Sequence, residues 1–349
     1  MDLSYFNARV RAWTGRLLRK PDYAPFFGLE GGARYVERLR STVYGPYLEV
    51  AGARYERTED IVSAALTDSL ADSFARIGKN APGAALTLLG ALNSTIEAYN
   101  LKTVIRGIAR GVGREEVRRA LIPAGGLGRA PLNTLLGAKD VPDLLRFLET
   151  WASPWAAPVR QGMAEFLRKG SLATMEIKLD QFAYGAPLAR LGRSRAARTI
   201  RDVLVFRIDI RNVVTLINIA GQGYSQEGAS ELFIDGGRML VRDTFLALSG
   251  VKQRGELLAK LASSIRDTGV AGLIAGTDPA RVSRLEGDLD ALAERRLRRL
   301  SVTEPLGIAV AAAFISMKVR EVKNLRLMER AAAFSIPEDE VAELLVYPL

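Results

Sequence analysis

The chain has 349 residues, 48% of them apolar and 25% charged, with a formal net charge of +10 and neither cysteine nor histidine. This length and composition are those of a globular protein with enough chain for two or three domains. The missing cysteine excludes disulfides, thiolate nucleophiles and cysteine-ligated metals, and the missing histidine excludes the commonest general base and transition-metal ligand. A carboxylate-bound Mg²⁺ or Ca²⁺ is the metal site left open, and we expect neither a resident metal nor a cofactor.

Helical periodicity dominates the chain. Leu101, Val104, Ile105 and Ile108 follow the i, i+3, i+4, i+7 spacing of a helix that buries one face. Alternating β-branched runs bounded by Asn-Gly or Asp-Gly turns are missing, so we predict an all-α fold. Stretches rich in alanine, leucine, arginine and glutamate predict helices over 59–77, 114–121, 140–150, 156–169, 195–206, 281–300 and 306–334.

Two kinds of turn signal lie between these stretches. The glycine pairs Gly125-Gly126 and Gly236-Gly237 belong to no strand–glycine loop–helix unit that could cradle a phosphate, and we interpret them as turns that end helices. The segment Ser335-Ile336-Pro337-Glu338 matches a capping box, which predicts Ser335 as the N-cap of a short final helix.

We expect no membrane-spanning segment. The longest apolar stretch, Leu306 to Ile315, is about half of the roughly 20 residues that a spanning helix needs. The first nine residues lack the basic and apolar regions of a signal peptide. These observations predict a cytoplasmic protein that is still able to bind a membrane protein.

An acidic residue followed three positions later by asparagine recurs twice at an interval of 112 residues. The three copies are Glu97 with Asn100, Asp209 with Asn212, and Glu321 with Asn324. Since the chain has only eight asparagines, three in one register indicate a common task. Six residues after the asparagine, the first and third copies have an arginine and the middle copy has asparagine, namely Arg106, Arg330 and Asn218.

The interval also predicts the domain organisation. Three copies of 112 residues fill 336 of the 349 positions, which predicts three similar helical domains over residues 1–127, 128–238 and 239–349. Each copy is far longer than the unit of a solenoid. Three related domains can close around a pseudo-threefold axis, as protomers do in cyclic oligomers, and would then surround a central opening.

The repeated acid–asparagine pair has two interpretations. Residues three apart lie on one face of a helix, and asparagine is a mediocre helix former, so its presence there indicates a hydrogen-bonding task. The pair is either a polar latch that fixes the packing within each copy or a lining of the central opening that contacts a partner. One carboxylate and one amide per copy are too few ligands for Ca²⁺, so we expect no metal there.

The densest basic cluster is Arg295-Arg296-Leu297-Arg298-Arg299. At helical spacing Arg295, Arg298 and Arg299 share one face. This face is either simply solvated or a docking surface for an acidic partner or lipid headgroups. Aromatic residues of the kind that stack on bases are absent from the cluster, which disfavours nucleic acid as its partner.

Five segments carry a resemblance to a known family: Asn7–Arg11, Ala98–Thr103, Leu232–Arg238, Pro305–Ile308 and Lys318–Leu349. In order and spacing they resemble the C subunit of the prokaryotic V/A-type rotary ATPase, the counterpart of the d subunit of the eukaryotic V-ATPase. The resemblance implies three similar helical domains that form a funnel. It also implies a non-catalytic protein on the cytoplasmic face of the membrane, which joins the rotor shaft to the proteolipid ring. Such a protein transmits torque between ATP synthesis or hydrolysis and proton or sodium transport.

Two other classes of function remain as alternatives. The +10 charge also suits a basic helical nucleic-acid-binding protein, whose affinity would fall steeply with salt. A Mg²⁺-dependent enzyme would need several carboxylates converging in one cleft, and the sequence has no such cluster. We therefore expect the partners to be the shaft subunits, the proteolipid ring and the rest of the rotary complex, without nucleic acid or a small-molecule substrate.

Overall fold

The computed structural model describes residues 2–347, apart from the side chain of Ser283. These residues form nineteen α-helices and two short 3₁₀ turns. Within the same range no strand occurs, and the one β-type contact is an isolated bridge between Ala124 and Leu127. The predicted all-α class is confirmed.

The chain forms two compact units. The first is built from the chain up to Ala156 and from Ser301 onward, and the second from Ala157–Leu300. The compact units are defined by which residues lie close together in space. The three predicted domains are defined by the 112-residue repeat in the sequence, so the two divisions need not coincide. The division into three domains therefore stays a prediction.

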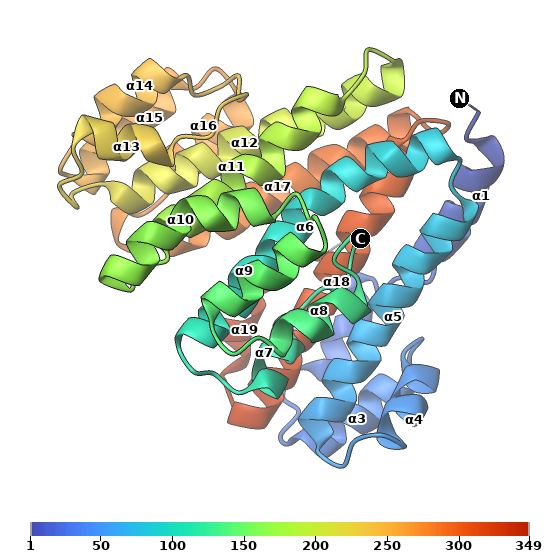
Figure 1. Ribbon diagram of the computed structural model, residues 1–349. Coiled ribbons are helices and arrows are strands. Elements are labelled where there is room, and N and C mark those ends of the chain that lie inside the picture. Colours follow the sequence, from blue (N-terminus) through green and yellow to red (C-terminus); the bar gives the residue numbers. More distant parts are fainter. Residues whose placement is uncertain (1, 348–349) are drawn as a thin grey trace. The chain divides into compact units, whose positions relative to one another are not determined.

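The first unit is organised around three long helices, α5, α6 and α18 (Figure 1). Helix α5 packs against α4 and α18, and α1 packs against α18. Three fully buried tyrosines, Tyr23, Tyr35 and Tyr44, lie in the core of this unit. The helices of this unit are α1 (Ser4–Thr14), α2 (Lys20–Tyr23), α3 (Gly32–Arg40), α4 (Gly45–Gly52), α5 (Thr58–Asn80), α6 (Gly83–Ala109), α7 (Arg114–Ala120), α8 (Arg129–Leu136), α9 (Val141–Thr150), α18 (Ala309–Phe334) and α19 (Glu338–Leu344).

The second unit is organised around α12, which contacts α11, α14 and α15 (Figure 1). Its core contains the apolar face of α12 and an edge-to-face pair, Phe233 and Phe245, whose ring centroids are 5.2 Å apart. The helices are α10 (Ala156–Lys169), α11 (Ala173–Arg190), α12 (Arg195–Ile219), α13 (Gln226–Leu232), α14 (Arg242–Ser249), α15 (Arg254–Ser264), α16 (Thr268–Ala275) and α17 (Val282–Thr303), of which α10 and α17 each extend slightly past the boundary of the unit.

The predicted helical stretches correspond to α5, α7, α9, α10, α12, α17 and α18. Several helices begin at a side-chain cap, because a short polar side chain accepts a backbone N–H that has no partner inside the helix. Ser194 caps α12, Ser225 caps α13 and Asp267 caps α16. Each such cap contributes about 0.5–2 kcal/mol.

Local structure repeats at the interval found in the sequence. Helices α7, α13 and α19 begin at residues 114, 226 and 338, each 112 after the last. The residues just before them at the same interval, Gly111, Gly223 and Ser335, all have positive φ angles, of 65°, 73° and 51°. Glycine adopts this left-handed conformation without strain, and it commonly ends a helix.

The predicted capping box at Ser335 is wrong. An N-cap residue has an extended backbone, whereas Ser335 is left-handed and ends α18. The N–H of Ile336 turns back to the carbonyl of Ala331 at 3.0 Å, and α19 begins only at Glu338, after Pro337. Residues 335–338 could form either a turn that ends α18 or a cap that starts α19. In the structure they form the turn.

No helix among residues 2–347 combines the length and the apolar character that crossing a bilayer demands.

Candidate functional site

Each of the three repeated asparagines donates a hydrogen bond to a backbone carbonyl 22 residues further along the chain. Asn100 donates to the carbonyl of Ile122 at 2.6 Å and accepts from the N–H of the same residue at 2.8 Å. Asn212 makes the same two bonds with Ile234, at 2.8 and 2.9 Å. Each of these two side-chain amides therefore pairs with both the N–H and the carbonyl of one backbone residue 22 positions further along the chain.

The third asparagine follows the same rule. Asn324 donates to the carbonyl of Val346 at 2.8 Å, again 22 residues further on. Asn100 and Asn212 are fully buried and Asn324 is 3% exposed, so none of the three reaches the surface. We call these contacts the asparagine latches.

The acidic residues of the first two copies bind a second loop. Glu97 accepts from the N–H of Gly126 at 2.7 Å, and Asp209 accepts from the N–H groups of Arg238 and Met239, both at 2.9 Å. Gly126 and Arg238 each lie 29 residues after their acid. Burial raises the pKa of both carboxyl groups, and the backbone N–H groups offset part of that rise.

The glycine pairs belong to these acid-binding loops, and the prediction that they end helices is wrong. Helix α7 already ends at Ala120, well before Gly125. A Cβ atom at Gly125 would collide with Oε1 of Glu97, and one at Gly237 would collide with Oδ1 of Asp209. Glycine is needed because the loop backbone lies directly against the carboxylate. The constant spacing from acid to glycine was the signal in the sequence that could have revealed this contact.

The acid of the third copy has different partners. Glu321 is fully buried and accepts from the N–H of Leu18 and the hydroxyl of Tyr44, both at 2.5 Å. The ammonium group of Lys318, one turn earlier on α18, lies 2.9 Å from the same carboxylate. A buried ion pair needs such additional hydrogen bonds, because each charge has lost its hydration. Glu321 thus attaches the N-terminal segment to α18.

The side chains of the repeated pair lie mostly inside the protein. Five of its six side chains are buried, and Glu97 is half-buried. Their hydrogen bonds run to nearby backbone and side chains of the same unit, which is what the packing interpretation requires. The two arginines of the repeat differ from them, since Arg106 and Arg330 are exposed on α6 and α18, as is Asn218 at the corresponding place on α12.

The predicted basic surface lies on α17. Arg295, Arg298 and Arg299 are exposed, while Leu297 is buried. Arg296, which belongs to the same cluster in the sequence, points the other way. Its guanidinium group pairs with Asp267 at 2.6 Å and lies 4.3 Å from the ring centroid of Phe206. This residue attaches α17 to the start of α16, and the arginine cluster around it gave no sign of that role.

A charged cavity in the first unit was not predicted from the sequence. It has a volume of about 240 Å³ and lies between α5, α7 and α8. Helices far apart in the sequence bring its charges together, and no sequence motif connects them. Its charged lining residues are Arg54, Asp60, Asp68, Glu115, Arg118, Arg119 and Arg129.

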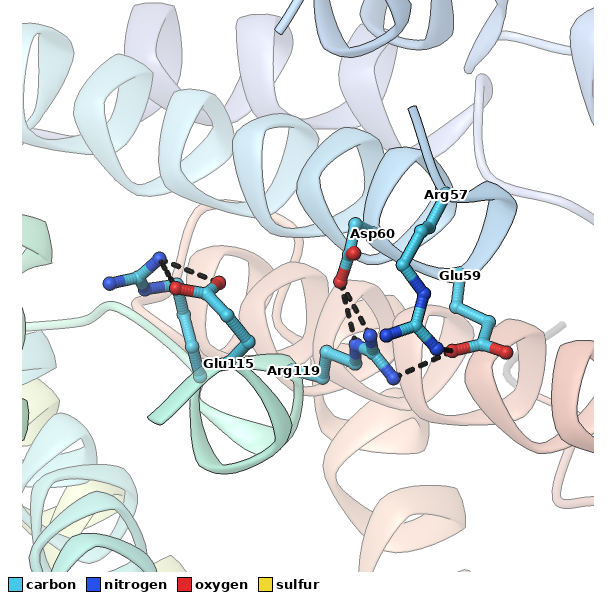
Figure 2. Close-up of polar contacts among 6 residues, drawn as sticks. Arg57, Glu59, Asp60, Glu115 and Arg119 are labelled. Carbon is cyan, nitrogen blue, oxygen red and sulfur yellow. Dashed lines mark hydrogen bonds and ion pairs between the residues drawn. The ribbon is translucent and has the colours of Figure 1, made fainter. Parts of the chain in front are cut away.

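Figure 2 shows ion pairs at the start of α5 and on α7, two of the helices that line this cavity. The guanidinium group of Arg119 reaches Asp60 at 2.6 Å and Glu59 at 2.9 Å, and Arg57 pairs with the same Glu59 at 3.1 Å. Arg118 pairs with Glu115 at 2.6 Å one turn away on α7. Helix α7 is therefore attached to the start of α5 by charge-assisted hydrogen bonds.

No cluster of three or more acidic side chains suited to a metal ion occurs in the part of the chain that the structure describes. The asparagine latches and the charged surfaces described above make up the candidate functional site.

The sequence comparisons place the chain in a family. A family model described as ATP synthase (C/AC39) subunit matches residues 6–344, almost the whole chain. The chain belongs to this family. The family expected from the resemblance is thereby confirmed.

Relatives in the family are similar over nearly their entire length. The C subunit of the A-type ATP synthase of Halorubrum lacusprofundi is 26% identical over 343 residues, which cover 98% of this chain and 97% of the relative. The C subunit of the V-type ATP synthase of Thermus thermophilus is 28% identical, with 99% of each chain covered. That of Deinococcus radiodurans is 27% identical, covering 97% of this chain and 90% of the relative.

Proposed function

We propose that this chain is a non-catalytic central-stalk subunit of a V/A-type rotary ATP synthase. It would join the rotor shaft to the proteolipid ring and transmit the torque that couples ATP synthesis or hydrolysis to proton or sodium transport. The observation that carries the proposal is the match, over 97–99% of the chain, of relatives named as the C subunits of A-type and V-type ATP synthases. Its place would be peripheral, on the cytoplasmic face of the membrane.

The packing latches support a mechanical role. A protein that transmits force must keep its shape under load, and buried polar groups with satisfied hydrogen bonds favour a single packed arrangement. Each asparagine latch attaches a downstream backbone segment to a long helix. The proposal includes three similar domains around a pseudo-threefold axis, with a funnel-shaped opening for the shaft.

The decisive experiment is a pull-down of the tagged protein from detergent-solubilised membranes. We expect the shaft subunits and the proteolipid ring to co-purify in stoichiometric amounts. The purified chain alone should not hydrolyse ATP. A chain that hydrolyses ATP by itself, or that leaves the membranes without these partners, would overturn the proposal.

A basic nucleic-acid-binding protein is the second candidate, since the net charge is +10. It predicts an affinity for duplex or single-stranded nucleic acid that falls steeply between about 50 and 200 mM salt. The rotary proposal predicts no more binding than any protein of equal charge shows. The two candidates are thus separated by one titration at two salt concentrations.

A further inference from the structure

The charged cavity of the first unit contains an excess of positive charge at one end. Arg54 and Arg129 both pair with a single carboxylate, Asp68, the former at 2.6 Å. The other charges along the cavity are balanced, as Figure 2 shows for those on α7 and at the start of α5. Two guanidinium groups that share one carboxylate retain a net charge of +1 and several N–H groups without an anionic acceptor.

A further cation contacts two of the residues that line the cavity. Nη2 of Arg326 donates to Oγ1 of Thr67 at 2.9 Å and to the carbonyl of Leu121 at 3.0 Å, and both of these residues line the cavity. Burial lowers the pKa of Arg326 to about 10, because the guanidinium group has lost most of its hydration.

Two buried donors beside the cavity also lack acceptors. The Nε atoms of Arg118 and Arg326 are buried and have no hydrogen-bond partner among residues 2–347. Most buried polar groups in folded proteins have a partner, so each exception needs an explanation. An oxygen-rich anion in the cavity would add the missing negative charge, and its oxygens are the acceptors that arginine N–H groups require.

We propose that this cavity binds a phosphate-type oxyanion, held chiefly by Arg54 and Arg129 on either side of Asp68. Planar guanidinium groups match the oxygens of phosphate in a two-point geometry that few other side chains provide. The side chains of Arg54 and Arg129 are 43% and 46% exposed, so the ion has access from solvent. At about 240 Å³ the cavity is smaller than the roughly 300–1,000 Å³ of typical sites for larger ligands, which favours an inorganic ion over a nucleotide.

This site does not depend on the proposed role in a rotary complex, and the purified chain is sufficient to test it. Isothermal titration calorimetry with inorganic phosphate, against sodium chloride at matched ionic strength, should give saturable binding for phosphate alone. Arg54→Gln and Arg129→Gln should each weaken this binding roughly tenfold or more, as expected for loss of a charge-assisted contact. Arg146→Gln, which alters an exposed arginine paired with Asp143 in the same unit, is the matched control and should bind normally.

Asp68→Asn provides a test in the opposite direction. Removing the carboxylate that competes for both arginines should tighten phosphate binding, roughly tenfold, whereas any variant that merely disturbs folding would weaken it. Circular dichroism checks that each variant is folded. Equal heats with phosphate and chloride, phosphate binding that neither arginine variant affects, or binding of ATP without binding of free phosphate would each overturn the proposal.

Discussion

The indole N–H of Trp155 donates a hydrogen bond of 2.8 Å to Oε2 of Glu97. The other oxygen of this carboxylate accepts from the N–H of Gly126 at 2.7 Å. The Glu97 side chain on α6 thereby binds both the loop before α8 and Trp155. Trp155 directly precedes Ala156, where the N-terminal part of the first compact unit ends. The repeated acid is a junction between segments that are 29 and 58 residues away.

Replacing Trp155 by phenylalanine should destabilise the first unit. Much of the ring volume is kept, but Oε2 of the half-buried Glu97 loses its donor, which costs about 1–3 kcal/mol for a buried polar group left unsatisfied. Urea denaturation followed by circular dichroism measures the change in the free energy of unfolding. Trp151→Phe, at an exposed ring that stacks on Phe147, is the control and should change stability by less than about 0.5 kcal/mol. Equal losses for the two variants would show that the hydrogen bond to Glu97 contributes nothing.

The asparagine latch of the second unit should contribute measurably to stability. Asn212→Ala leaves both the N–H and the carbonyl of Ile234 without their partner in a buried setting, and we expect a loss of about 2–4 kcal/mol for the two groups together. Asn133→Ala, at an exposed asparagine on α8, should stay within about 0.5 kcal/mol of the parent. The measurement is again the free energy of unfolding in urea. A wild-type value for Asn212→Ala would mean that Ile234 finds other partners.

The raised pKa of Asp209 predicts a pH dependence of defined sign. Since burial raises this pKa in the folded state, the folded protein binds the proton more tightly than the unfolded chain does. The contribution of this group to stability therefore decreases as pH rises from the ordinary value of 3.8 through the raised value. Asp209→Asn cannot titrate, so its destabilisation relative to the parent should shrink over that pH range. Unfolding free energies measured from about pH 4 upward test this, and a difference that grows with pH contradicts it.

Two glycines in the second unit should respond in opposite ways to the same substitution. Gly237→Ala places a Cβ against Oδ1 of Asp209 and should destabilise the protein by about 1–3 kcal/mol, as overpacking typically does. Gly185 lies inside α11 with open space around it, so Gly185→Ala should stabilise by about 0.5–1 kcal/mol through helix propensity. Thermal unfolding of both variants provides the comparison. If the two melting temperatures move in the same direction, the close approach of the loop to Asp209 is not what requires glycine.

The exposed arginines of α17 should contribute to docking. Reversing the charge of Arg295, Arg298 and Arg299 together should weaken co-purification with the membrane ring and leave the helical circular dichroism signal unchanged, because these side chains are exposed. Reversal of Arg190, Arg193 and Arg198, three exposed arginines of the same unit, is the matched control. Loss of docking in both triple variants would mean that the overall net charge, not the α17 surface, is responsible. Normal docking in the α17 variant would mean that its arginines are merely exposed to solvent and bind no partner.

The sequence by itself determined the helical class, the places of seven of the helices and the 112-residue register, whereas the long helices α6 and α11 were given no predicted range. These depend on local properties: apolar spacing sets the buried face of each helix, and similar sequences fold into similar local structure wherever they recur. The latch geometry keeps the same register, since Asn100, Asn212 and Asn324 each bind a residue 22 positions away. The family resemblance likewise needed only the order and spacing of short segments.

Only the tertiary structure decided which groups meet across long separations. Glu321 has the same place in the register as Glu97, yet its partners are Leu18 and Tyr44, about 300 residues earlier. Arg296 and Arg299 look alike in the sequence, but one is attached to Asp267 and the other is exposed. The charged cavity around Asp68 has no sequence signature, because its charges come from separate helices that only packing brings together. The repeated sequence determines the local structure that each segment forms. The packing of segments against one another determines which partner each charged side chain has.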